Sequence, residues 1–384
     1  LFSNPFTTAE IVAIGLIMLG MVFSGMSKGV TGLFYVYEQA EIPAAMTTLT
    51  TILRVALGVG VLLLGFGFVG LAAVSIIVNI ITLAILAVVA LRSFDLPGPW
   101  RVDWGLQRRM VRLGFPLMLI HLLQTIFISI DVYLLRVMLP NGEEVVGWYN
   151  SAYKWFNALQ IVPSFFTLAL FPIISREIQR SLEAARRMYT MSLKLMLLLA
   201  LPIAASITFL AEILVRIVGG AEFLPHGAIA LQIVIWAIPI GWLNSVTNYV
   251  LIALGLERMQ PRAFSVAVAF NVIANLLFIP YYSYQAASVT TILSEVVLMA
   301  VFAYYLRQRM SGVDWVGLLA KPFLLTAVVV IVMALGSLLH PVVGVALGLV
   351  VYAAGLLVLR IVGEDERQIL RSILPGPLVA RLRI

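Results

Sequence analysis

The sequence contains no cysteine and only three histidines among its 384 residues. The absence of cysteine excludes disulfide bonds and thiolate metal ligands, and three scattered histidines argue against a zinc centre. Charged residues are also scarce, at 11% of the chain. The sequence therefore predicts no metal centre and no cofactor.

Long polar segments are missing as well, because 62% of the residues are hydrophobic and the mean hydropathy is +1.06. Such a chain cannot present a water-soluble surface around a single packed core. A hydrocarbon core of about 30 Å needs about 20 apolar helical residues to cross it, and most of eleven apolar stretches reach that length. They cover residues 9–37, 43–66, 68–91, 114–139, 145–178, 189–218, 225–254, 262–280, 285–306, 315–339 and 341–361. The sequence predicts an all-α polytopic membrane protein.

Basic residues fall on every second junction between these stretches. The basic junctions hold Arg92 to Arg112, Arg176 to Arg187, Arg258 with Arg262, Arg307 with Arg309, and the arginines after residue 359. By the positive-inside rule these junctions are cytoplasmic, so residue 1 starts outside and the carboxyl terminus ends inside. This orientation explains the net charge of +7 better than a nucleic-acid partner does.

An internal repeat is visible at an offset of about six spans. Residues 70–79 resemble residues 285–294, Val30-Thr31 aligns with Val246-Thr247, and Pro43 aligns with Pro261. An even number of spans preserves orientation, so the repeats are parallel. Chance alignment of apolar sequence is the alternative.

If the repeat holds, residues 114–218 lack their partners, which would precede residue 1. We therefore expect 11 of 14 spans, with about three amino-terminal helices absent. The expected architecture is two parallel six-helix lobes around a central cavity, plus two carboxyl-terminal helices. The expected domains are half a lobe (1–93), a basic cytoplasmic linker (94–113), the second lobe (114–309), two additional helices (310–361) and a cytoplasmic amphipathic tail (362–384).

Two cations, Lys28 and Arg54, are predicted inside the membrane. Each lies 13 residues from Glu41, at a depth of about 20 Å on neighbouring antiparallel helices. A buried Lys or Arg costs roughly 2.5 to 3.5 kcal/mol on insertion scales, so it should find a partner or serve a ligand. The pair suggests an anion site. The alternatives are snorkelling, or neutralisation by a carboxylate of the absent helices.

Three further charged residues are predicted at membrane depth. Asp131 and Lys154 lie about equally far from the turn at Asn141 and are expected to form an ion pair, either a structural clamp or a working pair. Glu295, near the middle of its stretch, is either a protonation site or a neutral, hydrogen-bonded acid.

Polar side chains extend this pattern. Asn157 shares a helical face with Lys154, and Asn244 lies on another stretch with Thr247 and Asn248. Two further asparagines, Asn271 and Asn275, either line the same cavity or bond between helices, and the second reading is favoured.

Four motifs carry a resemblance to a known family. They are Gly114–Pro116, Ile130–Leu135, Val146–Lys154 and Ala169–Ser175. In these motifs and their order the chain resembles the polysaccharide-exporting flippases, relatives of the O-antigen flippases in the multidrug/oligosaccharidyl-lipid/polysaccharide (MOP) superfamily. The resemblance implies 14 spans in two lobes and alternating access.

The resemblance also implies a substrate and a place in the cell. The substrate would be an anionic oligosaccharide on a polyprenyl pyrophosphate, carried from the cytoplasmic to the outer leaflet for surface polysaccharide synthesis. Lys28 and Arg54 would hold the pyrophosphate, and Lys154, Asn157 and Asn244 would contribute to substrate binding. The cell membrane, its lipids and other polysaccharide-assembly proteins would surround the chain, with coupling to H⁺ or Na⁺ left open.

Three rival classes remain. A cation-coupled multidrug exporter of the same superfamily would favour carboxylates and aromatics over a cationic cavity. A major-facilitator carrier would carry an acidic and arginine-rich loop, which the junctions at 39–43 and 260 lack. A membrane-embedded glycan polymerase or ligase would need a roomy outer loop, and the outer junctions are short. A transporter is therefore favoured over an enzyme.

Overall fold

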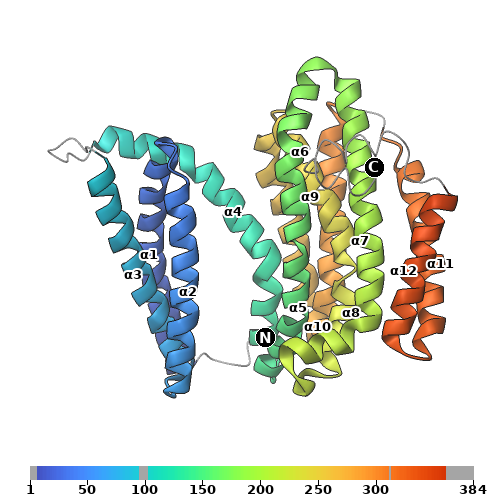
Figure 1. Cartoon of the computed structure of the whole chain (residues 1–384), viewed down its shortest axis with the longest axis horizontal. Helices are drawn as coiled ribbons and strands as arrows, with labels where there is room; N and C mark the ends of the chain where they lie inside the picture. The colour runs from blue at the N-terminus through green and yellow to red at the C-terminus, as the bar shows by residue number, and fades with distance from the viewer. Residues whose placement is uncertain (1–6, 95–102, 311–312, 360–384) are drawn as a thin grey trace. The chain divides into compact units, whose positions relative to one another are not determined.

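The computed structural model describes residues 7–94, 103–310 and 313–359, and the regular structure within these ranges is entirely helical (Figure 1). The chain divides into two compact units. Of the described residues, those up to Arg108 form the amino-terminal unit, and those from Arg109 onward form the carboxyl-terminal unit. Each unit is described by itself.

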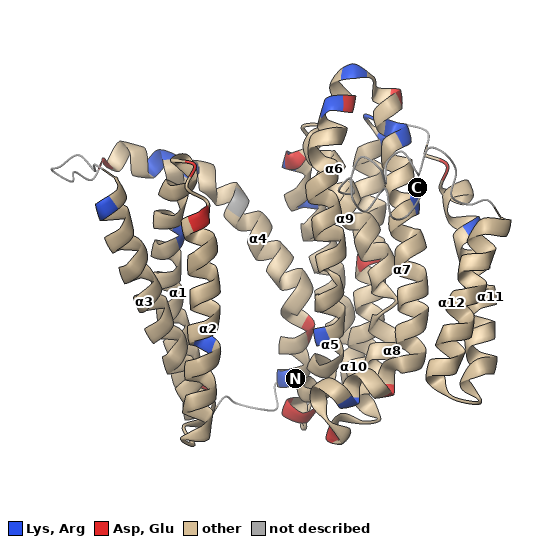
Figure 2. Cartoon of the chain, viewed as in Figure 1, with Lys and Arg blue, Asp and Glu red and all other residues tan. Residues whose placement is uncertain are grey.

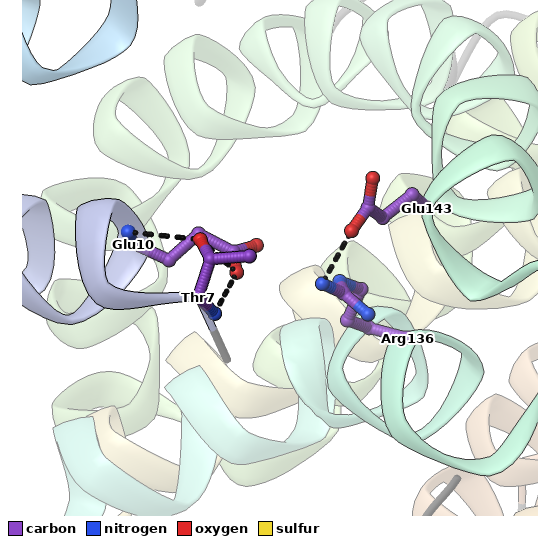
Figure 3. A network of polar contacts seen from close by, with 4 residues as sticks. All are labelled: Thr7, Glu10, Arg136 and Glu143. Atoms are coloured by element: carbon purple, nitrogen blue, oxygen red, sulfur yellow. Dashed lines mark hydrogen bonds and ion pairs between the residues drawn. The ribbon is translucent and has the colours of Figure 1, made fainter. Parts of the chain in front are cut away.

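The amino-terminal unit is built from three long helices. They are α1 (Thr8–Val36), α2 (Glu41–Leu63) and α3 (Gly67–Ser93). A capping box starts α1, because Thr7 Oγ1 accepts from the Glu10 amide and Glu10 Oε2 accepts from the Thr7 amide (Figure 3). Both α1 and α2 pack mainly on α3 and touch each other little.

The carboxyl-terminal unit holds most of the remaining helices. In chain order they are α4 (Trp104–Met138, whose first turn belongs to the amino-terminal unit), α5 (Gly142–Leu159), α6 (Ile161–Arg180), α7 (Leu182–Gly219), the 3₁₀ turn η1 (Ala221–Phe223), α8 (His226–Val234), α9 (Ala237–Ala253), the 3₁₀ turn η2 (Glu257–Met259), α10 (Gln260–Arg307), α11 (Trp315–Ser337) and α12 (Pro341–Val358). At the centre, α7 contacts α6, α8, α9, α11 and α12. Tyr189, Leu201 and Trp242 are fully buried there.

The turn between α4 and α5 needs a glycine. A Cβ on Gly142 would lie 2.3 Å from the carbonyl oxygen of Arg136, so any other residue would push the two helices apart. An ion pair fastens the same turn, since Arg136 Nη2 donates to Glu143 Oε1 at 2.6 Å (Figure 3). The predicted reversal of the chain near Asn141 is confirmed.

The long helix α10 is a helical hairpin. Ser283 has φ 52° and ψ −136°, which no α-helix contains. Across this break, Asn271 Nδ2 donates to Ser294 Oγ at 3.0 Å, although these residues are 23 positions apart. In a straight helix they would be separated by about 35 Å. The arms 260–282 and 284–307 therefore run antiparallel, as the separate stretches 262–280 and 285–306 predict.

Two other predicted stretches are single spans that break in the middle. Stretch 145–178 becomes α5 and α6, and stretch 225–254 becomes α8 and α9, which are bent by 41°. Pro163 and Pro239 explain both breaks, because proline lacks the amide hydrogen that would bond to the carbonyl four residues earlier. Those carbonyls belong to Leu159 and Ile235, where the preceding helices end.

The fold class predicted from the sequence is confirmed. Every predicted apolar stretch coincides with helix, and within the described ranges nine helical segments are long and apolar enough to cross a membrane, or ten with the bent pair α8–α9. The chain is a polytopic membrane protein. Figure 2 shows that Lys and Arg of the carboxyl-terminal unit gather toward the helix ends.

The linker predicted at 94–113 contains the boundary between the two compact units. From Trp104 onward it is the start of α4, because Asp103 Oδ1 accepts from the amides of Gly105 and Leu106 and nucleates the helix. The amphipathic tail predicted at 362–384 lies outside the described residues.

The helix bounds agree with the internal repeat. Shifted by the offsets of the sequence match, α1, α2 and α3 fall within a few residues of α8–α9, the first arm of α10 and its second arm. The one clear difference is that α1 is continuous where α8–α9 is bent.

Candidate functional site

A pocket of about 390 Å³ lies inside the carboxyl-terminal unit, between α4, α5, α6, α9 and both arms of α10. Its polar lining is neutral except for one carboxylate: Gln124, Asn157, Gln160, Ser164, Asn244, Ser245, Asn248 and Glu295. Four phenylalanines, Phe127, Phe156, Phe264 and Phe302, complete most of the wall. No Lys or Arg belongs to the lining in the part of the chain that the structure describes.

Asn244 and Glu295 form the buried side of the pocket. Asn244 Nδ2 donates to Glu295 Oε2 at 2.6 Å and to the Glu295 carbonyl oxygen at 2.9 Å. Asn244 is 4% exposed and Glu295 is 9% exposed. Because Glu295 lies 11 residues from the start of its arm and 12 from its end, this pair sits near the middle of the span.

Gly241 lets the Glu295 carboxylate approach α9. A Cβ at position 241 would lie 3.3 Å from Glu295 Oε1 and 3.4 Å from Cδ, closer than ordinary van der Waals contact. Any larger residue there would displace the carboxylate by a few tenths of an ångström. The sequence therefore keeps this position small where the acid must fit.

The breaks in the helices place the other polar side chains. Gln160, the residue between α5 and α6, lines the pocket together with Asn157 and Ser164, three and four positions away. Asn157 and Ser164 are exposed, so the pocket is open on their side. Discontinuous spans are typical of transporter binding sites near the bilayer midplane.

The structure brings together four of the residues singled out from the sequence: Asn157, Asn244, Asn248 and Glu295. Lys154 is exposed on α5 and does not line this pocket. Sequence reasoning missed Gln124, Gln160, Ser164 and Ser245. The two prolines that break the spans are the signal that would have indicated the region.

Asp131 is not paired with Lys154, so that prediction is wrong. Asp131, 1% exposed, accepts from Tyr149 Oη at 2.5 Å and Tyr153 Oη at 2.9 Å through Oδ2, and Oδ1 accepts from the Val132 amide. Tyr149 and Tyr153 are four residues apart and share the face of α5 toward α4, whereas Lys154 is turned by about 100° from Tyr153. Depth differs as well as direction, because Asp131 lies 7 residues before the end of α4 and Lys154 lies 12 residues after the start of α5.

The asparagines of α10 bond to each other and across its arms, as the favoured reading expects. Asn271 Oδ1 accepts from Asn275 at 3.0 Å, and Asn271 Nδ2 donates to Ser294. Both asparagines are buried and neither lines the pocket. Thr247 is likewise engaged elsewhere, in a hydrogen bond of 2.9 Å with Tyr189.

Lys28 and Arg54 are exposed side chains on α1 and α2. Their depths are less equal than predicted, because α1 ends at Val36 and α2 begins at Glu41. Counted from these ends, Lys28 lies about 12 Å in and Arg54 about 20 Å in. An anion site formed by both residues stays a prediction.

The fold is similar to that of solved membrane-protein structures. Similar solved structures include the lipid II flippase MurJ in an inward closed conformation, with a TM-score of 0.73, 13% identity, and coverage of 89% of this chain and 72% of that one. A mutant of a MATE protein has a TM-score of 0.50 and 16% identity, with 78% and 69% covered. At these identities the likeness establishes the fold alone.

The sequence places the chain in a family. The family described as "Polysaccharide biosynthesis protein" matches residues 3–227, which is more than half of the chain. The chain belongs to this family. No curated protein matches it at a significant level.

Proposed function

We propose that the protein is a flippase that moves a polyprenyl-pyrophosphate-linked oligosaccharide from the cytoplasmic to the outer leaflet. The observation that carries the proposal is the polar, mostly neutral pocket near the middle of the span, in a chain of the polysaccharide biosynthesis family. Amides and hydroxyls are the donors and acceptors that sugars require. The MurJ-like fold supports the same activity.

The substrate's pyrophosphate is negatively charged and needs a counter-charge inside the membrane. Lys28 and Arg54 would offset the pyrophosphate while it crosses. An inside-negative potential favours outward movement of an anion by about 2.3 kcal/mol per charge per 100 mV. The protein acts by alternating access and binds its substrate without altering it covalently.

We also propose an orientation for the chain in the membrane. The α6–α7 turn with Arg176, Arg180 and Arg186 would face the cytoplasm of a plasma membrane, and the α4–α5 turn would face outside. A cysteine at Asn141 should then react with an impermeant reagent added outside, and one at Ser181 should not. The opposite labelling would contradict this orientation.

One observation favours a second candidate, a cation-coupled multidrug exporter. A carboxylate, Glu295, stands among four phenylalanines, and aromatic walls with an acid suit an organic cation. The MOP fold accommodates both activities. The surrounding amides, in contrast, have no partner in an apolar drug.

Reconstitution separates the two candidates. Purified protein in liposomes should carry a fluorescent polyprenyl-pyrophosphate oligosaccharide between leaflets, measured by protection from a membrane-impermeant glycosidase. Liposomes without protein give the baseline. Transport of an organic cation such as ethidium, with no movement of the lipid, would overturn the flippase and establish the exporter.

A further inference from the structure

We infer that the pocket between α5, α9 and α10 is a subsite for an uncharged sugar residue of the carried glycan, with Asn244 and Glu295 as its deepest acceptors. The inference rests on the proposed flippase function and adds which part of the substrate this unit recognises. It assigns the sugar to the carboxyl-terminal unit alone.

Asn244 and Glu295, at the buried side of the pocket, each have an oxygen that receives no hydrogen bond from the described residues. Asn244 uses Nδ2 on Glu295, while Asn244 Oδ1 is buried and receives no hydrogen bond from the described residues. Glu295 Oε1 likewise receives none from them, and only Oε2 is engaged. A buried acceptor without a donor, such as Asn244 Oδ1, is costly, and at the wall of a pocket a ligand can supply the missing donor. Neighbouring hydroxyls of a sugar ring are such donors.

The aromatic wall of the pocket suits one face of a sugar ring. Phe264 lies between Phe127 and Phe302, with ring centroids 6.1 Å and 5.9 Å away and near-perpendicular planes. A pyranose has an apolar C–H face that packs on aromatic rings, and its edge carries the hydroxyls. Apolar walls with a few convergent polar groups are the usual composition of a small-molecule site.

The charge of the pocket lining limits which sugars can bind. The lining holds one carboxylate and, within the described ranges, no cation. An anionic sugar or a pyrophosphate would therefore find no counter-charge in this lining. Neutral sugars and N-acetylated sugars fit this environment.

Size limits the ligand to a short piece of the glycan. Ligand sites commonly measure about 300–1,000 Å³, and a pocket of 390 Å³ is at the small end of that range. The pocket would hold the sugar while the lipid and pyrophosphate bind elsewhere.

The test measures how the sugar changes affinity. Full-length protein in lipid nanodiscs is titrated with polyprenyl pyrophosphate alone and with the same lipid bearing glucose, galactose, N-acetylglucosamine or glucuronate. Wild-type protein should bind at least one neutral-sugar lipid about tenfold more tightly than the bare lipid, as expected for hydrogen bonds to a charged group. The glucuronate lipid should gain nothing.

Matched variants locate the effect. Glu295→Gln should remove most of the tenfold preference, and Asn157→Ala should reduce it several-fold. Asn150→Ala, which removes the same side chain two helical turns away and outside the pocket, should leave the preference unchanged. Gly241→Ala, which moves the Glu295 carboxylate without altering its charge, should act like a weaker Glu295→Gln.

Three outcomes overturn the inference. They are equal binding of bare and sugar-bearing lipids by wild type, equal gain from glucuronate, and a full preference in folded Glu295→Gln and Asn157→Ala proteins. If the lipid still crosses the membrane in any of these cases, the flippase function stands and only the subsite fails. If no lipid is carried at all, the proposed function fails first.

Discussion

Lys28 in the amino-terminal unit and Asn244 in the carboxyl-terminal unit occupy the same place in the internal repeat, at the offset that aligns Val30-Thr31 with Val246-Thr247. Lys28 is an exposed cation on a continuous helix. Asn244 is a buried amide, bonded to Glu295 on a helix that is bent. The same position of the repeated helices thus carries a charged side chain in the amino-terminal unit and a hydrogen-bonding amide in the carboxyl-terminal unit. For a substrate with a charged and a neutral part, such a division assigns each part to its own repeat.

The largest expected effect tests the charged repeat. Lys28→Asn would make the amino-terminal position match its counterpart, and Arg54→Gln would remove the second cation. Each change should lower lipid translocation by about 10- to 100-fold, the loss expected for charge-assisted hydrogen bonds. The measurement is leaflet transfer in liposomes.

Stability is the control for this prediction. Because Lys28 and Arg54 are exposed, thermal unfolding of the variants should match the wild type. Wild-type transport by both variants would remove the cations from the mechanism and leave the two repeats without a division of roles.

A second prediction concerns stability instead of transport, and compares a buried charge with the exposed ones. Asp131→Ala removes the carboxylate that accepts from both Tyr149 and Tyr153, and leaves Thr291 Oγ1, at 3.4 Å and 3.2 Å, as the one remaining partner of the two hydroxyls among the described residues. Thr291 can satisfy one hydroxyl and the other is orphaned at a cost of about 1–3 kcal/mol, so the free energy of unfolding should fall by at least about 1–3 kcal/mol. Denaturation of the purified protein followed by circular dichroism gives the value.

Lys154→Gln is the matched control, since this side chain is exposed and forms no ion pair with Asp131. It should change stability by less than about 0.5 kcal/mol. The double exchange Asp131→Lys with Lys154→Asp should not restore folding. Rescue by that exchange would revive the ion pair and contradict the tyrosine network.

The smallest effects compare corresponding helix contacts in the two repeats. Asn271→Ala removes the bond between the arms of α10, and Thr50→Val removes the 3.0 Å contact between Thr50 and Thr82 that joins α2 to α3. Side-chain hydrogen bonds in membranes contribute about 0.6 kcal/mol on average, up to about 1.7. Asn271→Ala should approach the upper value because Asn275 loses a partner too. Equal small losses would mean that both contacts serve packing alone.

The helices were predictable because the length of each apolar stretch can be counted directly in the sequence. Even the hairpin of α10 follows from two stretches with a polar Tyr281-Tyr282-Ser283 between them. The breaks at Gln160 and Trp236 were not predicted, since hydropathy does not register a missing amide hydrogen unless the proline is weighed separately.

The site was predictable only in part. Spacing along a helix tells which residues share a face, and so Asn244 and Asn248 were found together. It does not tell which neighbour meets that face. Asp131 therefore received Lys154 as a partner instead of Tyr149, and Gln124 and Ser245 went unnoticed because a single polar residue in an apolar run has no pattern.

The hairpin of α10 also bears on how this chain is made. A lone asparagine entering a bilayer during synthesis exposes its amide to hydrocarbon, which is costly. Asn271 and Ser294 lie almost equally far from the turn at Ser283, so closing the hairpin pairs them without the help of any other helix. The two arms would thus leave the translocation machinery as one unit, and nascent chains truncated before Ser294 should be held there longer than chains that include it.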